Sequence, residues 1–540
     1  MMNSQIAWNR TRSTVAGMQG AVASAHPLAT QAGLDILRSG GNAVDAVVAT
    51  AAALNVVEPY MSGVGGVGFL LLHLADGQTK SLNFSGNTPA AGTPDQFKPE
   101  DQDCGPRACL IPGNVAGWLE AVRTHGTKTP LEIFQAAIRL AEEGFPLHPL
   151  NARLIEVCLP RLNEAAREVY GSVECRIGAV LRQPDLAQSL HGIADGGCEY
   201  FYRGELAHKI ADYIQSQGGL LSRDDLAEYT PDWDTPISVD YRGLEVKTCP
   251  PNNEGFQILQ TLKLLEETDL NSLGHNSTEY IHLISEAIKL AVADRIEWSG
   301  DPKFHDVPLE RLLGDGYIAE RRQLIDRKRA SQSEGERWSG PRSRDVVSPG
   351  RIDGLTTHMA AVDAEGNAAS LTQSLGNGFG SGVMIPGTGI VLNNFIYWTE
   401  IDPNCPTPNL IQPGKRWSCC MAPVQVFRDG KFWFSIATPG SFGILQTTMQ
   451  MLLNVVEFAA DPQLAIEAPR FRVLEGTRLQ IEDRIDAAVR EELTARGHAL
   501  ELVGDFSMLV GGGQSVMIDP DSGARLAGAD PRRDGYALAY

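Results

Sequence analysis

The feature that most constrains this chain is a strand–turn–strand pattern between Asp353 and Gly382, DGLTTHMAAVDAEGNAASLTQSLGNGFGSG. The Thr and Val content of Thr356 to Val362 predicts a strand, AEGN at 364–367 predicts a turn, and Ala368 to Leu375 predicts the returning strand. The glycine-rich loop that follows is not typical of a strand, and it could let the backbone approach a ligand closely.

The segment upstream of this hairpin suggests a cleavage site. Arg327 to Gly354 is polar, charged and interrupted by Gly and Pro, as a cleavable surface segment would be. Cutting the Leu355–Thr356 bond would give Thr356 a free α-amine with a pKa of about 7.7–8.0, which could accept the proton of its own hydroxyl. The alternative is that Thr356 and Thr357 are ordinary strand residues, because Thr-Thr pairs are common.

Motifs along nearly the whole chain resemble those of the γ-glutamyltransferases, a family of self-cleaving N-terminal-nucleophile hydrolases. TTHMAAVDAEGNAASLT is similar to the start of that family's small subunit. Further similar stretches occur in the family's order: Ala23 to Phe69, IPGNVAGWLEAV, TPISVDYRGLEV, ADRIEWSGDP, ATPGSFG and GADPRRDGYALAY.

The resemblance implies an α/β (α+β) fold, the four-layer αββα sandwich of N-terminal-nucleophile hydrolases. It also implies a large subunit over 1–355 and a small subunit over 356–540, interleaved in one domain. Apolar periodicity independently predicts helices and strands in alternation. The predicted helices include Pro27–Ser39, Ala43–Val56 and Ser441–Ala459, and the predicted strands include Phe69–Leu74, Gly389–Phe395 and Lys431–Ala437.

Four residues carry the catalytic prediction. Thr356 is the expected nucleophile, and the backbone N–H groups of Gly440 and Ser441, at a turn that opens a helix, would hold an oxyanion. Ser374 aligns with a family threonine whose hydroxyl supports the nucleophile. His358 lies on the same strand face as Thr356 and could contact the site, although a structural role is the alternative.

The predicted substrate contacts depart from the family pattern. Ser85 stands where the family has an arginine that binds the α-carboxylate, and Trp398 stands where it has an aspartate that binds the α-ammonium. Four further family positions have changed: a glutamine to Phe395, an asparagine to Gly376 with Asn377 beside it, and two serines to Cys419 and Cys420. The candidates for binding a substrate carboxylate are Arg416, Ser374 and Asn377.

These changes predict an amide substrate without an amino-acid headgroup, because an unpaired charge among Phe, Trp and Cys is costly. Within the family the pattern looks most like oxamate amidohydrolase, which releases ammonia from oxamate in purine-nitrogen breakdown. The alternatives are a glutaryl-type acylase, a true γ-glutamyltransferase or glutathione hydrolase, and, in another class, an inactive scaffold that kept the fold.

Composition narrows the choice of partners. A formal net charge of −20 over 540 residues argues against nucleic acid and anionic membrane. Nine cysteines without a CxxC pair favour reduced thiols, and Cys419–Cys420 lacks companions at metal-ligand spacing, so we expect no metal and no cofactor.

The first residues lack the apolar region of a secretory signal, so a cytoplasmic location is expected. The expected partners are a small amide and the two cleavage products as a heterodimer, with a further dimer possible.

Overall fold

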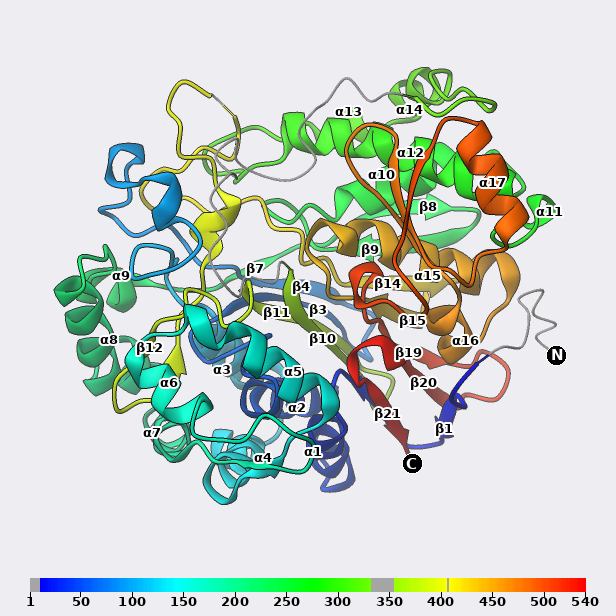
Figure 1. Ribbon diagram of the computed structural model, residues 1–540. Helices are drawn as coiled ribbons and strands as arrows, with labels where there is room; N and C mark the ends of the chain where they lie inside the picture. The colour runs from blue at the N-terminus through cyan, green and yellow to red at the C-terminus, as the bar shows by residue number, and fades with distance from the viewer. Residues whose placement is uncertain (1–9, 332–353, 406) are drawn as a thin grey trace.

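The computed structural model describes residues 10–331, 354–405 and 407–540. Two seven-stranded, mainly antiparallel sheets lie face to face at its centre, and helices cover the outer face of each (Figure 1). A small apolar cluster fills the space between the sheets. One large cluster lies between the first sheet and its helices, and a second large cluster lies between the second sheet and its helices. This arrangement is the four-layer αββα sandwich that the sequence predicted.

The first sheet contains the strand that begins near Thr356. Its order is β21-β2-β10-β11-β3-β4-β7. Its strands are β2 (Ala21–Ser24), β3 (Val67–His73), β4 (Thr79–Phe84), β7 (Asp232–Asp234), β10 (Leu355–Val362), β11 (Ala368–Gly376) and β21 (Tyr536–Ala539).

The second sheet has the order β1-β20-β19-β15-β14-β9-β8. Its strands are β1 (Val15–Gly17), β8 (Ile237–Tyr241), β9 (Leu244–Thr248), β14 (Val424–Arg428), β15 (Lys431–Ala437), β19 (Gln514–Ile518) and β20 (Arg525–Ala529). The smaller pairings are β5 (Phe145–Pro146) with β6 (Val180–Leu181), β12 (Met384–Ile385) with β13 (Ile390–Val391), and β16 (Phe471–Val473) with β17 (Arg478–Ile481) and β18 (Ala499–Leu502).

The helices divide between the two outer layers. The layer on the side of the first sheet contains α1 (Pro27–Arg38), α2 (Ala43–Val57), α3 (Asn114–His125), α4 (Pro130–Glu143), α5 (Pro149–Cys158), α6 (Glu164–Tyr170), α7 (Pro184–Tyr202), α8 (Glu205–Ser216) and α9 (Arg223–Glu228). The other layer contains α10 (Phe256–Leu265), α11 (Leu270–Leu273), α12 (Thr278–Trp298), α13 (Leu309–Leu312), α14 (Asp315–Arg322), α15 (Ile444–Phe458), α16 (Pro462–Glu467) and α17 (Ala487–Ala495).

Helix α2 is the buried centre of its layer. Every one of its residues is buried, and Asn42 and Asp45 form a capping box at its start. Helix α1 packs closely on it at Gly33, where an added Cβ would lie 2.2 Å from the Thr50 hydroxyl oxygen. The packing of α2 against β10 and β11 in turn supports the strand on which Thr356 lies.

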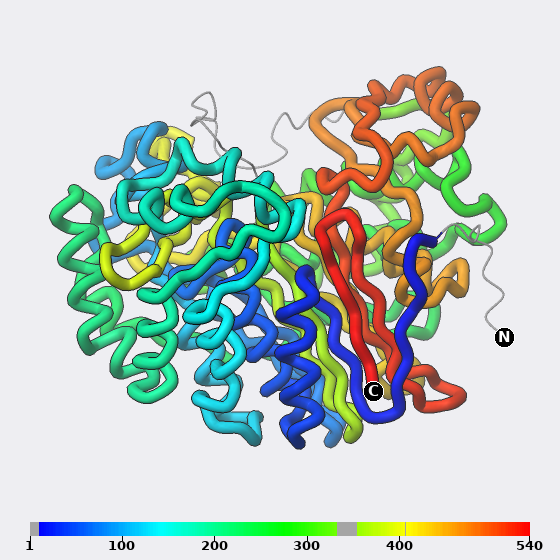
Figure 2. Tube along the Cα trace, turned by 60° about the horizontal axis from the view of Figure 1, so that its bottom comes forward, coloured from blue at the N-terminus to red at the C-terminus, as the bar shows by residue number. Residues whose placement is uncertain are grey.

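Segments on either side of Thr356 share both sheets. Strand β10 lies between β2, from the start of the chain, and β11, while β2 also pairs with the C-terminal strand β21. Figure 2 shows the N-terminal strands in blue beside the C-terminal strands in red. A cut before Thr356 would therefore leave two pieces that share each sheet and each interior cluster.

The predicted strand over Gly389–Phe395 is wrong in most of its length. Only Ile390–Val391 forms β13, and Phe395–Trp398 is a short 3-10 helix. The side chain of Asn393 explains the break, because it bonds the backbone of Gly65 and Leu110 in place of a strand neighbour. The predicted helix from Ser441 begins with a 3-10 turn over Ser441–Gly443 and continues as α15.

Two further findings concern the described residues as a whole. The nine cysteines all lie there, and none forms a disulfide. No helix among these residues has the length and apolar character needed to cross a bilayer.

The contact at Gly33 gives a stability prediction. Gly33→Ala should lower the free energy of unfolding by about 1–3 kcal/mol, because the new methyl group overlaps the Thr50 hydroxyl and the carbonyl of Ala46. Gly316→Ala in α14 is the matched control: no atom lies within 4 Å of its added Cβ, so stability should stay equal or rise. Urea unfolding of both variants tests the difference, and equal losses would contradict the close packing.

Candidate active site

The site forms where β10 and β11 pair at their open end. Thr356 lies directly opposite Ser374, and the register shifts between Leu355 and Thr356, so that Leu375 is an extra residue on β11. The N–H of Leu375 turns away and donates to Met61 O at 3.0 Å. Bulges of this kind re-aim side chains at active sites, and here the bulge places the Thr356 side chain against the β11 backbone.

Ser374 is the polar centre of this junction. Its hydroxyl oxygen accepts hydrogen bonds from Thr356 Oγ1 at 3.1 Å and from the Gly376 N–H at 2.8 Å. The same hydroxyl donates to Leu355 O at 2.8 Å. Since Leu355 O belongs to the Leu355–Thr356 peptide, Ser374 contacts both the predicted nucleophile and the carbonyl that it would attack.

The predicted oxyanion turn lies beside the same peptide. Gly440 and Ser441 both have positive φ, 136° and 56°, and such strain at a non-glycine residue often occurs at functional sites. A Cβ added to Gly354 would lie 2.6 Å from Ser441 Cβ and 2.8 Å from Ser441 N. The structure therefore brings the turn to within two residues of Thr356, and only glycine at 354 permits that contact.

A buried acid next to the predicted nucleophile was missed by the sequence analysis. Thr357 Oγ1 donates to Glu58 Oε2 at 3.0 Å, and Glu58 is 1% exposed at the end of α2. Burial raises the pKa of Glu58 to about 8, although the Thr357 hydrogen bond and the charge of Arg533 oppose the shift. Glu58 is thus largely a neutral acid near pH 7.

Arg533 connects this acid to the oxyanion turn. Its side chain packs against Gly512, whose N–H donates to Thr438 Oγ1 at 2.7 Å, two residues before Gly440. Its guanidinium also donates to Met508 O at 3.0 Å. Burial lowers the pKa of Arg533 to about 10, and Glu58 is the carboxyl group that most opposes this shift.

Asn377 lies at the start of the glycine-rich loop, and one hydrogen bond from its amide nitrogen is directed to Asp103. Its Nδ2 donates to Asp103 Oδ1 at 2.7 Å, while its backbone N–H donates to Asn394 Oδ1 at 3.0 Å. Its Oδ1 has no partner among the described residues. Asn377 Oδ1 can therefore accept a hydrogen bond from a substrate N–H, whereas the Asp103 carboxylate beside the amide nitrogen would repel a substrate carboxylate there.

Trp398 forms an apolar wall beside this loop. A Cβ on Gly376 would lie 2.9 Å from the Trp398 ring, so only glycine fits between the indole and Asn394. Phe395 stacks on Trp417 with ring centroids 4.4 Å apart, and Trp398 lies 5.3 Å from Phe395. These aromatic side chains are almost wholly buried.

Ser85 is buried behind the aromatic wall. Its hydroxyl donates to Asn83 Oδ1 at 2.8 Å and accepts from Asn252 Nδ2 at 3.1 Å, while its carbonyl accepts from Trp417 Nε1 at 3.0 Å. The place of the family's arginine is thus filled by a neutral network.

Cys419 and Cys420 continue this wall toward the oxyanion turn. Both are buried, and burial raises the pKa of each thiol above its ordinary value of 9.0. They are consequently neutral at pH 7 and do not repel an anion. The charge of Glu254 raises the pKa of Cys420 further, while the charges of Arg295 and Arg472 oppose that shift.

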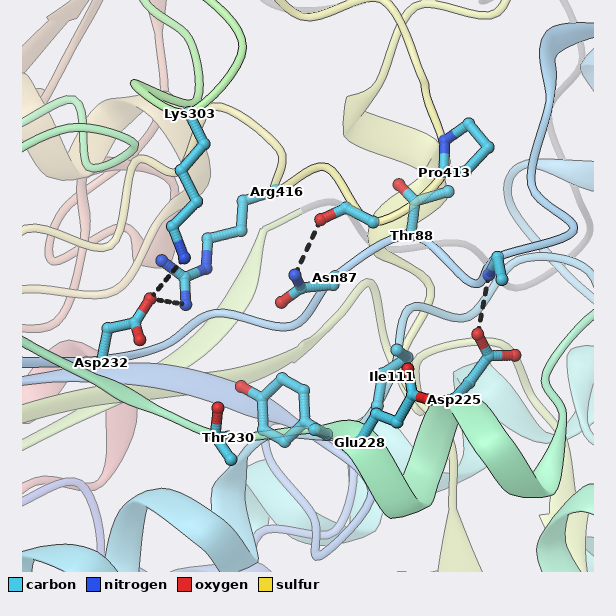
Figure 3. Close-up of a pocket in the computed structure, with 13 residues that line it drawn as sticks. Asn87, Thr88, Ile111, Asp225, Glu228, Thr230, Asp232, Lys303, Pro413 and Arg416 are labelled. Atoms are coloured by element: carbon cyan, nitrogen blue, oxygen red, sulfur yellow. Dashed lines mark hydrogen bonds and ion pairs between the residues drawn. The ribbon is translucent and has the colours of Figure 1, made fainter.

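Two of the predicted contact residues make their side-chain contacts with residues other than Thr356 and Ser374. Arg416 lines a cavity of about 400 Å³ that contains none of the predicted catalytic residues, and its Nη2 donates to Asp232 Oδ2 at 2.7 Å (Figure 3). Lys303 bonds the same carboxylate oxygen at 2.9 Å. His358 is fully buried between the sheets, where Nδ1 lies 2.8 Å from Thr372 Oγ1, and burial lowers its pKa to about 3.

One further cluster among the described residues has metal-ligand chemistry. Ligand atoms of His282, Glu286 and His498 lie within 4.8 Å of one another. His282 Nδ1 is 2.9 Å from His498 Nε2, and the Lys289 ammonium donates to Glu286 at 2.7 Å. A direct His–His hydrogen bond and an ion pair thus already satisfy this cluster without an ion.

Comparison with known proteins decides the family. The family model described as gamma-glutamyltranspeptidase matches residues 29–540. The glutathione hydrolase proenzyme of Bacillus subtilis is 35% identical over 97% of this chain and 92% of its own length. This chain belongs to the gamma-glutamyltranspeptidase family.

Members of this family that act on other amides are equally similar. The Acylase ACY 1 proenzyme of a Pseudomonas strain is 36% identical over 97% of this chain and 94% of its own length. The structure of a cephalosporin acylase from Bacillus halodurans superposes with a TM-score of 0.90 at 33% identity, covering 99% of this chain and 98% of that one. The chain is therefore a hydrolase of the N-terminal-nucleophile class acting on amide-type C–N bonds, in a family whose relatives are proenzymes.

The position of Ser374 gives the first test of this site. Ser374→Ala should slow cleavage of the Leu355–Thr356 bond by roughly 10²-fold, the cost of losing one oxyanion donor, because it removes the hydrogen bond to Leu355 O. Ser374→Thr should keep most of the rate. The appearance of two chains on denaturing gels over time is the measurement.

Ser370→Ala is the matched control for that experiment. Ser370 lies on the same face of β11, is equally buried, and makes no side-chain hydrogen bond among the described residues. Its removal should leave the cleavage rate unchanged. Equal slowing by both changes would show that general damage to β11, and not the Ser374 hydroxyl, controls cleavage.

Glu58 gives a prediction of pH dependence. Its folded pKa of about 8 lies above its ordinary value of 4.5, so the folded state holds a proton that the unfolded state releases between these values. This stabilisation is complete below pH 4.5 and is lost as the pH rises toward 8, by at most about 1.4 kcal/mol per pH unit. The Glu58→Gln side chain cannot ionise, so the free energy of unfolding of this variant should fall less steeply as the pH rises from 4.5 to 8.

Thermal unfolding from pH 5 to 8 measures this difference best in the Thr356→Ala background, where the chain should stay in one piece. The exposed Glu143→Gln provides the control and should follow the parent profile. Parallel profiles for Glu58→Gln and its parent would mean that Glu58 is already ionised at neutral pH.

Proposed function

We propose that this protein is an N-terminal threonine amidohydrolase that cuts the amide of an acyl group without an α-ammonium. The substrate assignment in this proposal rests on the neutral hydrogen-bond network around Ser85. Ser85 stands at the position where the family resemblance implies an arginine that binds a glutamyl carboxylate. Trp398, at the place of the aspartate that would pair with the ammonium, points to the same conclusion.

The chemistry begins with cleavage of the chain itself. Thr356 Oγ1 attacks the carbonyl carbon of Leu355, the C–N bond breaks to leave an ester and a free Thr356 amine, and water hydrolyses the ester. The Ser374 hydroxyl, 2.8 Å from Leu355 O, supports the charge that develops on that oxygen. The two products are residues 1–355 and 356–540, which we expect to remain together as a heterodimer.

Hydrolysis of the substrate uses the same atoms. The Thr356 amine accepts the hydroxyl proton while Oγ1 attacks the amide carbon, and the N–H groups of Gly440 and Ser441 hold the oxyanion. The proton then passes to the leaving nitrogen as the C–N bond breaks. Water attacks the resulting ester, releases the acid and restores Thr356, with no metal or cofactor required in these steps.

The monoamides of dicarboxylic acids are the substrate class that fits best. Oxamate is the shortest of them and would give oxalate and ammonia. The similarity to two acylases favours a longer glutaryl-type acyl group as the second candidate. A γ-glutamyl substrate is the third, supported by the glutathione hydrolase relative. The cytoplasmic location stays a prediction.

The deciding experiment compares three amides on the processed protein. Ammonia release from oxamate and from glutaramate, and aniline release from a γ-glutamyl anilide, should show turnover of at least one monoamide and little of the anilide. Thr356→Ala should remain a single chain with no activity, and Thr356→Ser should keep both cleavage and turnover.

Three results would overturn the proposal. Normal cleavage of Thr356→Ala would remove the nucleophile assignment. Anilide turnover at a rate comparable with the monoamides would show that a γ-glutamyl headgroup binds although Ser85 and Trp398 have replaced the charged arginine and aspartate of the family. A wild-type chain that is not cleaved and hydrolyses none of the three would indicate an inactive scaffold.

A further inference from the structure

Two arginines that no sequence comparison above singles out lie on the oxyanion-turn side of the site. A Cβ on Gly443 would be 3.1 Å from Arg472 Nε and 3.3 Å from its Cζ, so the guanidinium lies against the backbone three residues beyond Gly440. The Arg295 Cζ lies 4.1 Å from the centroid of the Phe442 ring. Both side chains therefore contact the short 3-10 turn that follows the oxyanion turn.

The two arginines play different parts. Arg295 is 1% exposed, and its Nη1 donates to Glu254 Oε2 at 3.1 Å, so it is committed to a buried ion pair. Arg472 is only partly buried, and so is Ser441. Since its neighbours Phe471 and Val473 point into the core, Arg472 projects from the opposite face of β16 toward the turn.

The surroundings suit a carboxylate. The charges of both arginines act on Cys420, which burial keeps a neutral thiol, and Arg295 lies over the nearly buried Phe442 ring, so these surroundings are of low polarity. A guanidinium at the edge of such a wall can bind a carboxylate through two parallel hydrogen bonds, and it is more effective there than in open solvent.

We propose that Arg472, backed by Arg295 and its partner Glu254, forms a carboxylate subsite for the substrate beside the oxyanion turn. The effect of this subsite on catalysis rests on the proposed amide hydrolysis, whereas the binding of a carboxylate by Arg472 does not depend on it. The family has its arginine at the position of Ser85, where this chain has no charge. The proposed subsite supplies a positive charge from Arg472 instead, on the side of the oxyanion turn.

The subsite also orients the substrate. Asn377 Oδ1 is an acceptor at the glycine-rich loop, and the Arg472 guanidinium lies against the backbone at Gly443, just beyond the oxyanion turn. An amide with N–H groups at one end and a carboxylate at the other would find a complementary group at each. A substrate carrying an ammonium in place of the carboxylate would meet a like charge at Arg472 and would be rejected.

The test compares charged and neutral amides on processed Arg472→Gln. For an acyl-side carboxylate the pair is glutaramate and butyramide, and for a leaving-group carboxylate the pair is N-acetylglycine and its N-methylamide. The ratio of kcat/KM for the charged over the neutral member of one pair should fall roughly ten- to hundred-fold, mainly through KM. Arg472→Lys should recover part of the loss.

Arg478→Gln is the matched control. Arg478 lies on the neighbouring strand β17, is exposed, and pairs with Glu501 on the surface, so its removal should leave both ratios unchanged. The pair that responds to Arg472→Gln identifies which side of the amide carries the carboxylate. No change in either ratio would overturn the proposal.

A binding measurement separates this inference from the proposed function. Glutarate should raise the thermal unfolding temperature of the processed wild type and of Arg478→Gln, but not of Arg472→Gln. This readout holds even if none of the amides is hydrolysed. Equal stabilisation of Arg472→Gln, or no stabilisation of the wild type, would overturn the subsite.

Discussion

The pairing of β10 with β11 is the constraint on which the rest of the site depends. Because the register shifts at Leu355–Thr356, one hydroxyl on Ser374 reaches both Thr356 Oγ1 and Leu355 O. A one-residue slip would turn the Thr356 side chain to the other face of the sheet. The packing of the fully buried helix α2 against these two strands makes such a slip costly.

The described side chains around this junction form two unlike walls. One consists of Gly376, Trp398 and the aromatic rings behind it, and it presents an acceptor at Asn377. The other consists of the Gly440–Ser441 turn, and Arg472 lies beyond it. This asymmetry has consequences for specificity, since a site with donors at one end and an acceptor at the other selects orientation as well as charge.

The resemblance to a known family predicted the four-layer fold and the Thr356–Ser374 pair, and apolar periodicity predicted most helices and strands. Neither predicted Glu58, Arg295 or Arg472. Each lies far along the chain from Thr356, and a buried acid or an arginine in a helix or a strand has no local signature of function. The sequence also offered Arg416 as a carboxylate ligand, whereas the fold directs that side chain to Asp232.

The sequence by itself therefore determined the family, the strand on which the predicted nucleophile lies, and the residue types of the altered headgroup pocket. Only the tertiary structure decided how those residues are used. It buries Ser85 in a neutral network, directs the amide nitrogen of Asn377 to Asp103, and brings Arg472 to the turn at Gly443. The physical reason is that hydrogen-bond capacity and charge are distributed by contacts between different elements of the fold, which no local pattern records.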